Sequence, residues 1–161
     1  VNFWFENWWL IFYHAFMVHR GRIIRSIWAA CLLLAGLNHA RILLQHGLFW
    51  DYYGASLASA IYWSSLTFID PLVAALLFVR PKIGVPVTVV VITTNIVHNL
   101  ALTANNTRDG TLFRYVISSP QLMSQIGFLL FVIATWRMAQ SDVGRVNVVG
   151  TVKMTNNPSQ M

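Results

Sequence analysis

Asp70 is an acidic residue in the middle of an apolar run. The run, SLTFIDPLVAALLFVRPK at residues 65–82, lies in a segment long enough to cross a bilayer as a helix. A charge at that depth is costly in hydrocarbon, so it usually faces the protein interior, a water-filled cavity or an opposite charge. A buried carboxylate can carry a proton, act as a general acid or base, or balance a cationic group. It can also form a structural ion pair, for which Arg41 is the other mid-span charge.

Polar side chains recur at helical spacing in three further apolar runs. The candidates are Asn38, His39, Arg41, Gln45 and His46 in the first run, Trp63 and Thr67 beside Asp70 in the second, Asn95, His98 and Asn99 in the third, and Gln121 and Gln125 in the fourth. In each run the spacing brings most of them to one side of a helix. Carboxylate and imidazole groups suit proton transfer, so Asp70, His98 and His39 are the candidate catalytic residues. The others are candidate ligand-binding residues.

The composition indicates which elements position these residues. Of the 161 residues, 57% are hydrophobic and 10% are charged, which is unusual for a soluble domain. Four runs are long enough to span a membrane: residues 26–49, 58–79, 84–104 and 115–137. The connections are short, so consecutive helices must be antiparallel neighbours. We therefore predict an all-α integral membrane protein, a four-helix up-down bundle over residues 26–137.

Both flanking segments differ from the spans. Residues 1–25 begin with a very aromatic stretch that is too short to span, and we expect an interfacial helix with its tryptophans at headgroup level. Alternatively, residues 1–16 are a mis-assigned extension, because MVHRGRIIRS from Met17 looks like a natural start. Residues 138–161 are polar and are expected to form a cytoplasmic tail with little order.

The basic residues predict the orientation. Eight of them lie on one side of the predicted spans: Arg20, Arg22, Arg25, Arg80, Lys82, Arg137, Arg145 and Lys153. Only Arg108 and Arg114 lie on the other side. Because basic residues are retained in the cytoplasm, we expect both termini there, in a multi-pass protein of a bacterial inner membrane. This topology and anionic lipid account for the net charge of +6, so we predict no nucleic-acid partner.

With this orientation, all four polar clusters fall in the non-cytoplasmic half of the bilayer. At about 1.5 Å per residue, Asp70 lies deepest, about 18 Å from the outer end, and His39 and Asn95 lie at about 14 to 15 Å. The other half is almost entirely apolar. We therefore predict one shared polar pocket, open outward or sideways, that binds a small apolar or amphiphilic, lipid-like molecule and uses no cofactor. The oligomeric state is left open.

Two other classes remain open. His39, His46 and His98 could supply axial imidazoles to a haem or ligands to a metal, although His98 falls between the other two in depth. A non-catalytic assembly or transport accessory is the third class. Motifs of nucleophilic catalysis and of nucleotide binding are not found in the sequence.

The order of features resembles the emopamil-binding-protein superfamily of sterol isomerase-like (EXPERA) membrane proteins. The resemblance is carried by TFIDPL in the second helix, TTNIVHN in the third and SSPQL at the entry to the last, and it covers about residues 26–137. It implies a cavity for amphiphilic ligands in which acidic residues face a cationic amine or carbocation. In some members the activity is the shift of a sterol double bond by protonation and deprotonation. The resemblance implies that Asp70 is the acid and that His98 or Asn95 is its partner.

Overall fold

The computed structural model describes residues 3–48, 50, 52, 54–107 and 111–141, with side chains from Arg20 onward. The regular structure of these residues is entirely helical. The five helices are α1 (Phe3–His46), α2 (Leu57–Val79), α3 (Pro81–Asn106), α4 (Leu112–Ser118) and α5 (Pro120–Gln140). The prediction of an all-α chain is therefore confirmed for the described residues.

Four segments are long and apolar enough to cross a membrane: Arg20–His46, Leu57–Val79, Pro81–Asn106 and Pro120–Gln140. Each of them exposes large apolar side chains, for example Leu44 at 88%, Phe68 at 70% and Leu130 at 63%. In water such surfaces would drive aggregation, whereas in a bilayer they face lipid. By length and composition, the chain is a multi-pass membrane protein.

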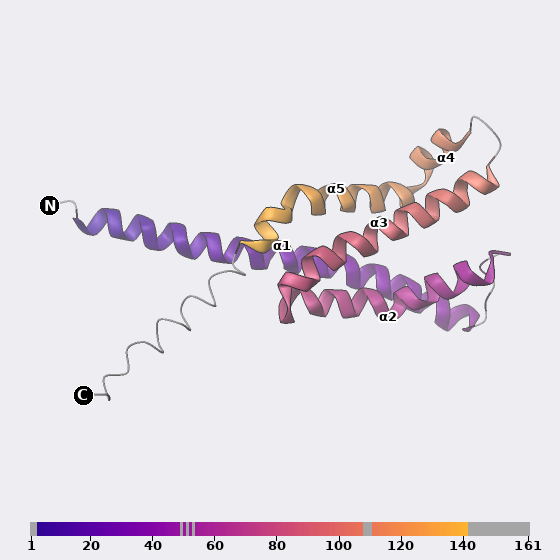
Figure 1. Cartoon of the computed structure of the whole chain (residues 1–161), viewed down its shortest axis with the longest axis horizontal. Coiled ribbons are helices and arrows are strands. Elements are labelled where there is room, and N and C mark those ends of the chain that lie inside the picture. Colours follow the sequence, from indigo (N-terminus) through magenta and orange to yellow (C-terminus); the bar gives the residue numbers. More distant parts are fainter. Residues whose placement is uncertain (1–2, 49, 51, 53, 108–110, 142–161) are drawn as a thin grey trace.

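The spans pack in a ring. α1 contacts α2 and α5, and α3 contacts the same two helices. α1 and α3 run in one direction along the molecule, and α2 and α5 run back (Figure 1). We call the end that holds Arg80 and Gln140 the inner end, and the end that holds Gly54 and Thr107 the outer end.

α1 is longer than its predicted span. It is one helix of 44 residues and does not break before Ser26, where the predicted interfacial segment should end. At 1.5 Å per residue it is about 66 Å long, and its first part extends past the inner end of the ring (Figure 1). The predicted segment of residues 1–25 is therefore helical over its described part and continuous with the first span. Most of the predicted tail, residues 142–161, lies outside the described residues.

The predicted fourth span, residues 115–137, is divided by a break. α4 ends at Ser118, Ser119 has an extended backbone, and α5 starts at Pro120. Proline disfavours helical geometry at the preceding residue but fits the first position of a helix. The Ser119 hydroxyl caps α5 by accepting a hydrogen bond from the Leu122 amide at 3.4 Å. The span therefore begins at Pro120, and residues 115–118 belong to a separate short helix.

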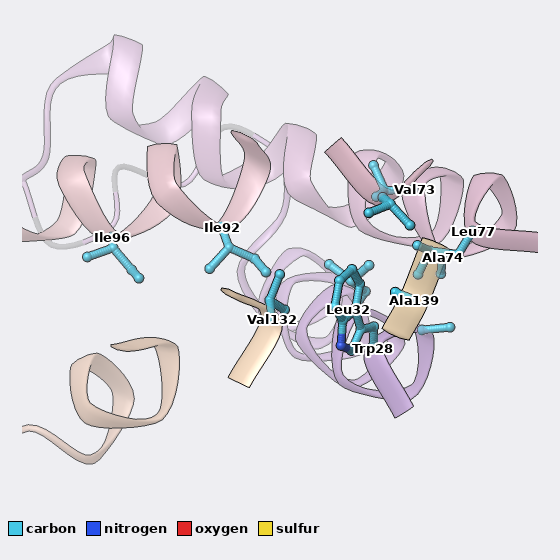
Figure 2. Close-up of a cluster of buried hydrophobic side chains, with 11 residues drawn as sticks. Trp28, Leu32, Val73, Ala74, Leu77, Ile92, Ile96, Val132 and Ala139 are labelled. Atoms are coloured by element: carbon cyan, nitrogen blue, oxygen red, sulfur yellow. The ribbon is translucent and has the colours of Figure 1, made fainter. Parts of the chain in front are cut away.

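The apolar core lies toward the inner end. Trp28 and Leu32 of α1 pack there with Ala74 and Leu77 of α2 and with Val132 of α5, and Ile92 and Ile96 of α3 extend the cluster outward (Figure 2). Two hydrogen bonds join α1 to α5 beside it. The Trp28 indole donates to the Thr135 hydroxyl at 3.1 Å, and the Arg25 guanidinium donates to the Ala139 carbonyl at 2.7 Å.

Candidate functional site

A cavity of about 170 Å³ lies inside the ring, on the outer side of the core. All four spans contribute to it. Its lining residues are Leu32, Ala35, Asn38 and His39 of α1, Asp70 of α2, Val91, Ile92 and Asn95 of α3, and Gln121, Ser124, Gln125 and Phe128 of α5. We call it the Asp70 cavity. It brings together six of the thirteen predicted site residues: Asn38, His39, Asp70, Asn95, Gln121 and Gln125.

The close approach of α1 to α2 positions Asp70 and His39. A Cβ atom added at Gly36 would lie 3.1 Å from Cδ of Pro71 and 3.3 Å from Cβ of Asp70, so the missing side chain is what lets the two helices meet there. His39 follows Gly36 by about one turn and lines the same cavity. Pro71 also lacks the amide that would bond the Thr67 carbonyl, which leaves that oxygen free of its helical partner.

Asp70 and His39 are buried polar residues with unmet hydrogen-bonding capacity. Asp70 is 4% exposed and His39 is 9% exposed. Across the described residues, the Asp70 carboxylate has no hydrogen bond or ion pair, and the buried Nδ1 of His39 has no hydrogen-bond partner. Buried polar groups are normally satisfied, and a charge is the most expensive exception.

Asn99 links three helices toward the outer end. Its side-chain oxygen accepts a hydrogen bond from the indole of Trp63 at 3.1 Å. Its amide nitrogen donates to Gln125 at 3.0 Å and to Asn95 at 3.3 Å. The bonds to Trp63 and Gln125 join α3 to α2 and α5, and the bond to Asn95 lies within α3. We call Asn99, Asn95, Gln125 and Trp63 the Asn99 cluster.

His98 lies among aromatic rings rather than in the Asp70 cavity. Its ring centre is 4.6 Å from that of Tyr62 and 5.5 Å from that of Trp63. The buried His98 Nε2 and Tyr62 hydroxyl have no hydrogen-bond partner within the described part of the chain. Thr67 does not line the cavity either, and its buried hydroxyl is unpaired among the same residues. Asp70 therefore shares its cavity with His39 and Asn95, and His98 lies outside it.

Three predicted residues of α1 lie outside the cavity as well. Arg41, Gln45 and His46 are exposed, and His46 stacks on Trp50 with ring centres 4.0 Å apart. Arg41 follows His39 by two residues, which turns it by about 200° around the helix. No ion pair joins it to Asp70 in the residues that the structure describes. The ion-pair alternative for Asp70 is therefore not what this structure contains.

The three candidate histidines lie in three different places: His39 in the cavity, His98 among the aromatic rings, and His46 at the end of α1. Among the described residues, no group of three His, Cys, Asp or Glu side chains could hold a metal ion.

Sequence reasoning did not select Gly36 or Ser124 for the site. The sequence does contain a pattern that could have indicated Gly36. A small residue about one turn before a polar residue in a membrane helix often marks a close contact between helices.

Comparison of the chain with protein-family models, with curated proteins and with solved structures finds no match. Its class therefore rests on its own geometry: a multi-pass membrane protein with a cavity that polar and apolar side chains of all four apolar helices line.

Proposed function

We propose that this chain is an up-down four-helix membrane protein whose Asp70 cavity binds the polar part of a small apolar or amphiphilic molecule. The observation that carries the proposal is the buried Asp70 carboxylate, which has no hydrogen bond or ion pair in the described structure. Such a group destabilises the empty protein, so its presence is best explained by a ligand that pairs with it.

The size of the cavity and the place where it opens limit which part of the ligand can lie inside it. About 170 Å³ holds a small polar group or a few waters, but not a whole lipid. Three lining residues, Asn38 of α1 with Gln121 and Ser124 of α5, are also exposed, so the cavity opens sideways between these helices. We infer that the apolar remainder of the ligand lies in this opening, in contact with lipid.

The pair of Asp70 and His39 supports proton transfer as the chemistry of this site. A carboxylate and an imidazole that line one cavity can act on opposite sides of a bound molecule, one as acid and the other as base. This arrangement agrees with what the resemblance to sterol isomerase-like proteins implies for Asp70. Within the proposal, the partner of Asp70 is His39 or Asn95, which line its cavity.

Mass spectrometry of molecules retained in mild detergent tests the proposal. The wild-type protein should carry a stoichiometric small amphiphile, and Asp70→Asn, which keeps the shape of the side chain but removes its charge, should lose it at least tenfold. Arg41→Gln is the matched control, because it removes a charge from an exposed position outside the cavity, and it should retain the molecule. Thermal unfolding shows whether each variant is folded.

Three outcomes would count against this proposal. Equal retention by wild type and a folded Asp70→Asn variant would place the molecule elsewhere. A wild-type protein that carries no small molecule but a stable protein partner would favour the accessory role. A Soret band in the purified protein would favour the haem alternative.

A further inference from the structure

A second cavity lies on the outer side of the Asn99 cluster. Its volume is about 230 Å³, and it is lined by Trp63, Asn99, Leu102, Thr103, Asn106, Tyr115, Ser119, Gln121 and Leu122. Most of these residues carry polar groups, and several of them lie where α3 and α4 approach the outer end. We call it the outer cavity.

The two cavities adjoin each other through the Asn99 cluster. Gln121 lines both of them. Asn99 lines the outer cavity, whereas its hydrogen-bond partners Asn95 and Gln125 line the Asp70 cavity. The partition between the cavities therefore consists of amide side chains, with the Trp63 indole bonded to Asn99 on the outer side.

An amide partition differs physically from the inner wall of the Asp70 cavity. At the inner end, Trp28 and Leu77 are fully buried and Leu32 is 2% exposed, so the wall is close-packed and apolar. Opening such a wall to water exposes hydrocarbon. When the Asn99–Gln125 bond opens, by contrast, water can bond to both the Asn99 amide nitrogen and the Gln125 amide oxygen, so the net cost is modest.

We propose that the outer cavity is the route by which water and protons reach Asp70, and that the Asn99–Gln125 hydrogen bond is its gate. The proposal rests on the proposed function only in treating Asp70 as the functional group. It makes access to Asp70 one-sided: protons exchange with the outer end and not with the inner end. Asn99 and Gln125 are then positioning residues that control access rather than residues that react.

Labelling of a cysteine in the Asp70 cavity measures this access. The background is Cys31→Ala, which removes the single native cysteine, and the reporter is Asp70→Cys in lipid nanodiscs. The reagent is a methanethiosulfonate with a permanent positive charge, which does not enter through lipid. We expect slow labelling in this background and labelling at least tenfold faster after Gln125→Ala, which removes one side of the gate.

Two matched variants separate the gate from general loosening. Asn105→Ala removes an exposed amide of α3, the helix that carries Asn99, at a position outside both cavities, and it should leave the rate unchanged. Leu102→Trp, which fills part of the outer cavity, should reverse the acceleration caused by Gln125→Ala. If Gln125→Ala does not fold, Asn99→Ala replaces it, because it removes the same hydrogen bond. If Asp70→Cys does not fold, Ala35→Cys replaces it, because Ala35 lines the same cavity.

Fast labelling that Leu102→Trp does not slow would overturn the proposal, since water would then reach Asp70 by another route. An unchanged rate after loss of the Asn99–Gln125 bond would overturn it as well. The result is independent of ligand retention. If the labelling experiment contradicts the gate, the retention experiment with Asp70→Asn still tests ligand binding. If no ligand is retained, the labelling experiment still tests the gate.

Discussion

Asp70 and His39 differ from Thr88 and Asn99, two other buried polar residues of the spans, in what they bond. Thr88 donates to the Gly84 carbonyl of its own helix at 2.8 Å, and Asn99 uses both its oxygen and its nitrogen in bonds to neighbouring helices. These residues follow the rule that polar groups in a membrane protein are satisfied internally. Asp70 and the Nδ1 of His39 do not follow it in the described structure. Buried groups without a partner also occur at Tyr62, Thr67 and His98, outside the Asp70 cavity. Asp70 and His39 differ from these in lining one cavity, where a bound molecule could satisfy both.

Three glycines of the spans differ in how much space a side chain would have, so we expect Ala substitutions at them to lower stability by different amounts. A Cβ at Gly84 would lie 2.6 Å from backbone atoms of Leu76 and Leu77, so α2 and α3 would have to separate. At Gly36 the nearest atoms are side-chain atoms of Pro71 and Asp70, at 3.1 and 3.3 Å. We expect Gly84→Ala to lower the free energy of unfolding by about 1–3 kcal/mol, as overpacked sites do, and Gly36→Ala to lower it less. Thermal unfolding in detergent, followed by tryptophan fluorescence, measures both.

Gly127→Ala is the control for this series, because nothing lies within 4 Å of a Cβ at that position. It should leave the melting temperature unchanged or raise it slightly. Gly36→Ala should also weaken ligand retention, since the new methyl group presses on Asp70. Equal melting temperatures for all three variants would mean that α1, α2 and α3 are not packed as described.

At the scale of elements, the start of α5 depends on one hydroxyl group. Ser119 caps the helix directly before Pro120, and its Oγ accepts from the Leu122 amide at 3.4 Å. Ser119→Ala should lower the free energy of unfolding by about 1 kcal/mol, the usual effect of a lost N-cap. It should also speed hydrogen exchange at the Leu122 amide, which mass spectrometry of the deuterated protein detects.

Ser118→Ala is the matched control, one residue earlier. The Ser118 hydroxyl is exposed and donates to the Tyr115 carbonyl within α4, so its loss should change neither stability nor exchange in α5. If both serine variants behave alike, the division between α4 and α5 is not maintained by the cap.

The helices whose bounds were predicted well are those whose start and end are marked by capping or helix-breaking residues. The second span was predicted at residues 58–79 and is Leu57–Val79. Its start is marked by Ser56 and its end by RPK, so propensity and hydropathy agree there. The fourth span was predicted to begin at residue 115, because the apolar run continues through Ser119 and Pro120. Proline is compatible both with a kinked helix and with the first turn of a new one, and composition does not separate the two.

The sequence grouped the polar residues by their distance from the span ends, but it did not predict which side of each helix faces inward. Counting residues from the span ends predicted that His39, Asp70, Asn95, Gln121 and Gln125 lie in the same half of the bilayer, and they line one cavity. The same counting included Arg41, Gln45 and His46, which are exposed. In a membrane helix the lipid-facing side is as apolar as the buried side, so hydrophobic periodicity fixes the rotation of a helix only weakly. Only packing contacts, such as that of Gly36 with Pro71, fix which side faces inward.

At the scale of the whole molecule, the two ends of the ring differ. The inner end is closed by the apolar core and by the bonds from Arg25 to Ala139 and from Trp28 to Thr135. The outer half contains the Asp70 cavity and the outer cavity. If the outer end faces away from the cytoplasm, a ligand or proton enters from that side or from the membrane, and the inner end acts as the seal.

The proposed orientation can be tested with two reporter cysteines in the Cys31→Ala background, in bacterial cells that express the protein. Asn105→Cys marks the outer end and Gln140→Cys the inner end, and both positions are exposed. Because most of the described basic residues lie at or beyond the inner end, we expect a membrane-impermeant maleimide to label Asn105→Cys in intact cells. Gln140→Cys should react only after the membrane is disrupted. The reverse pattern would put the termini outside and would make the cytoplasm the source of water for Asp70. Labelling of both positions in intact cells would mean that the chain inserts in two orientations, because eight basic residues against two would then be too weak a bias to fix it.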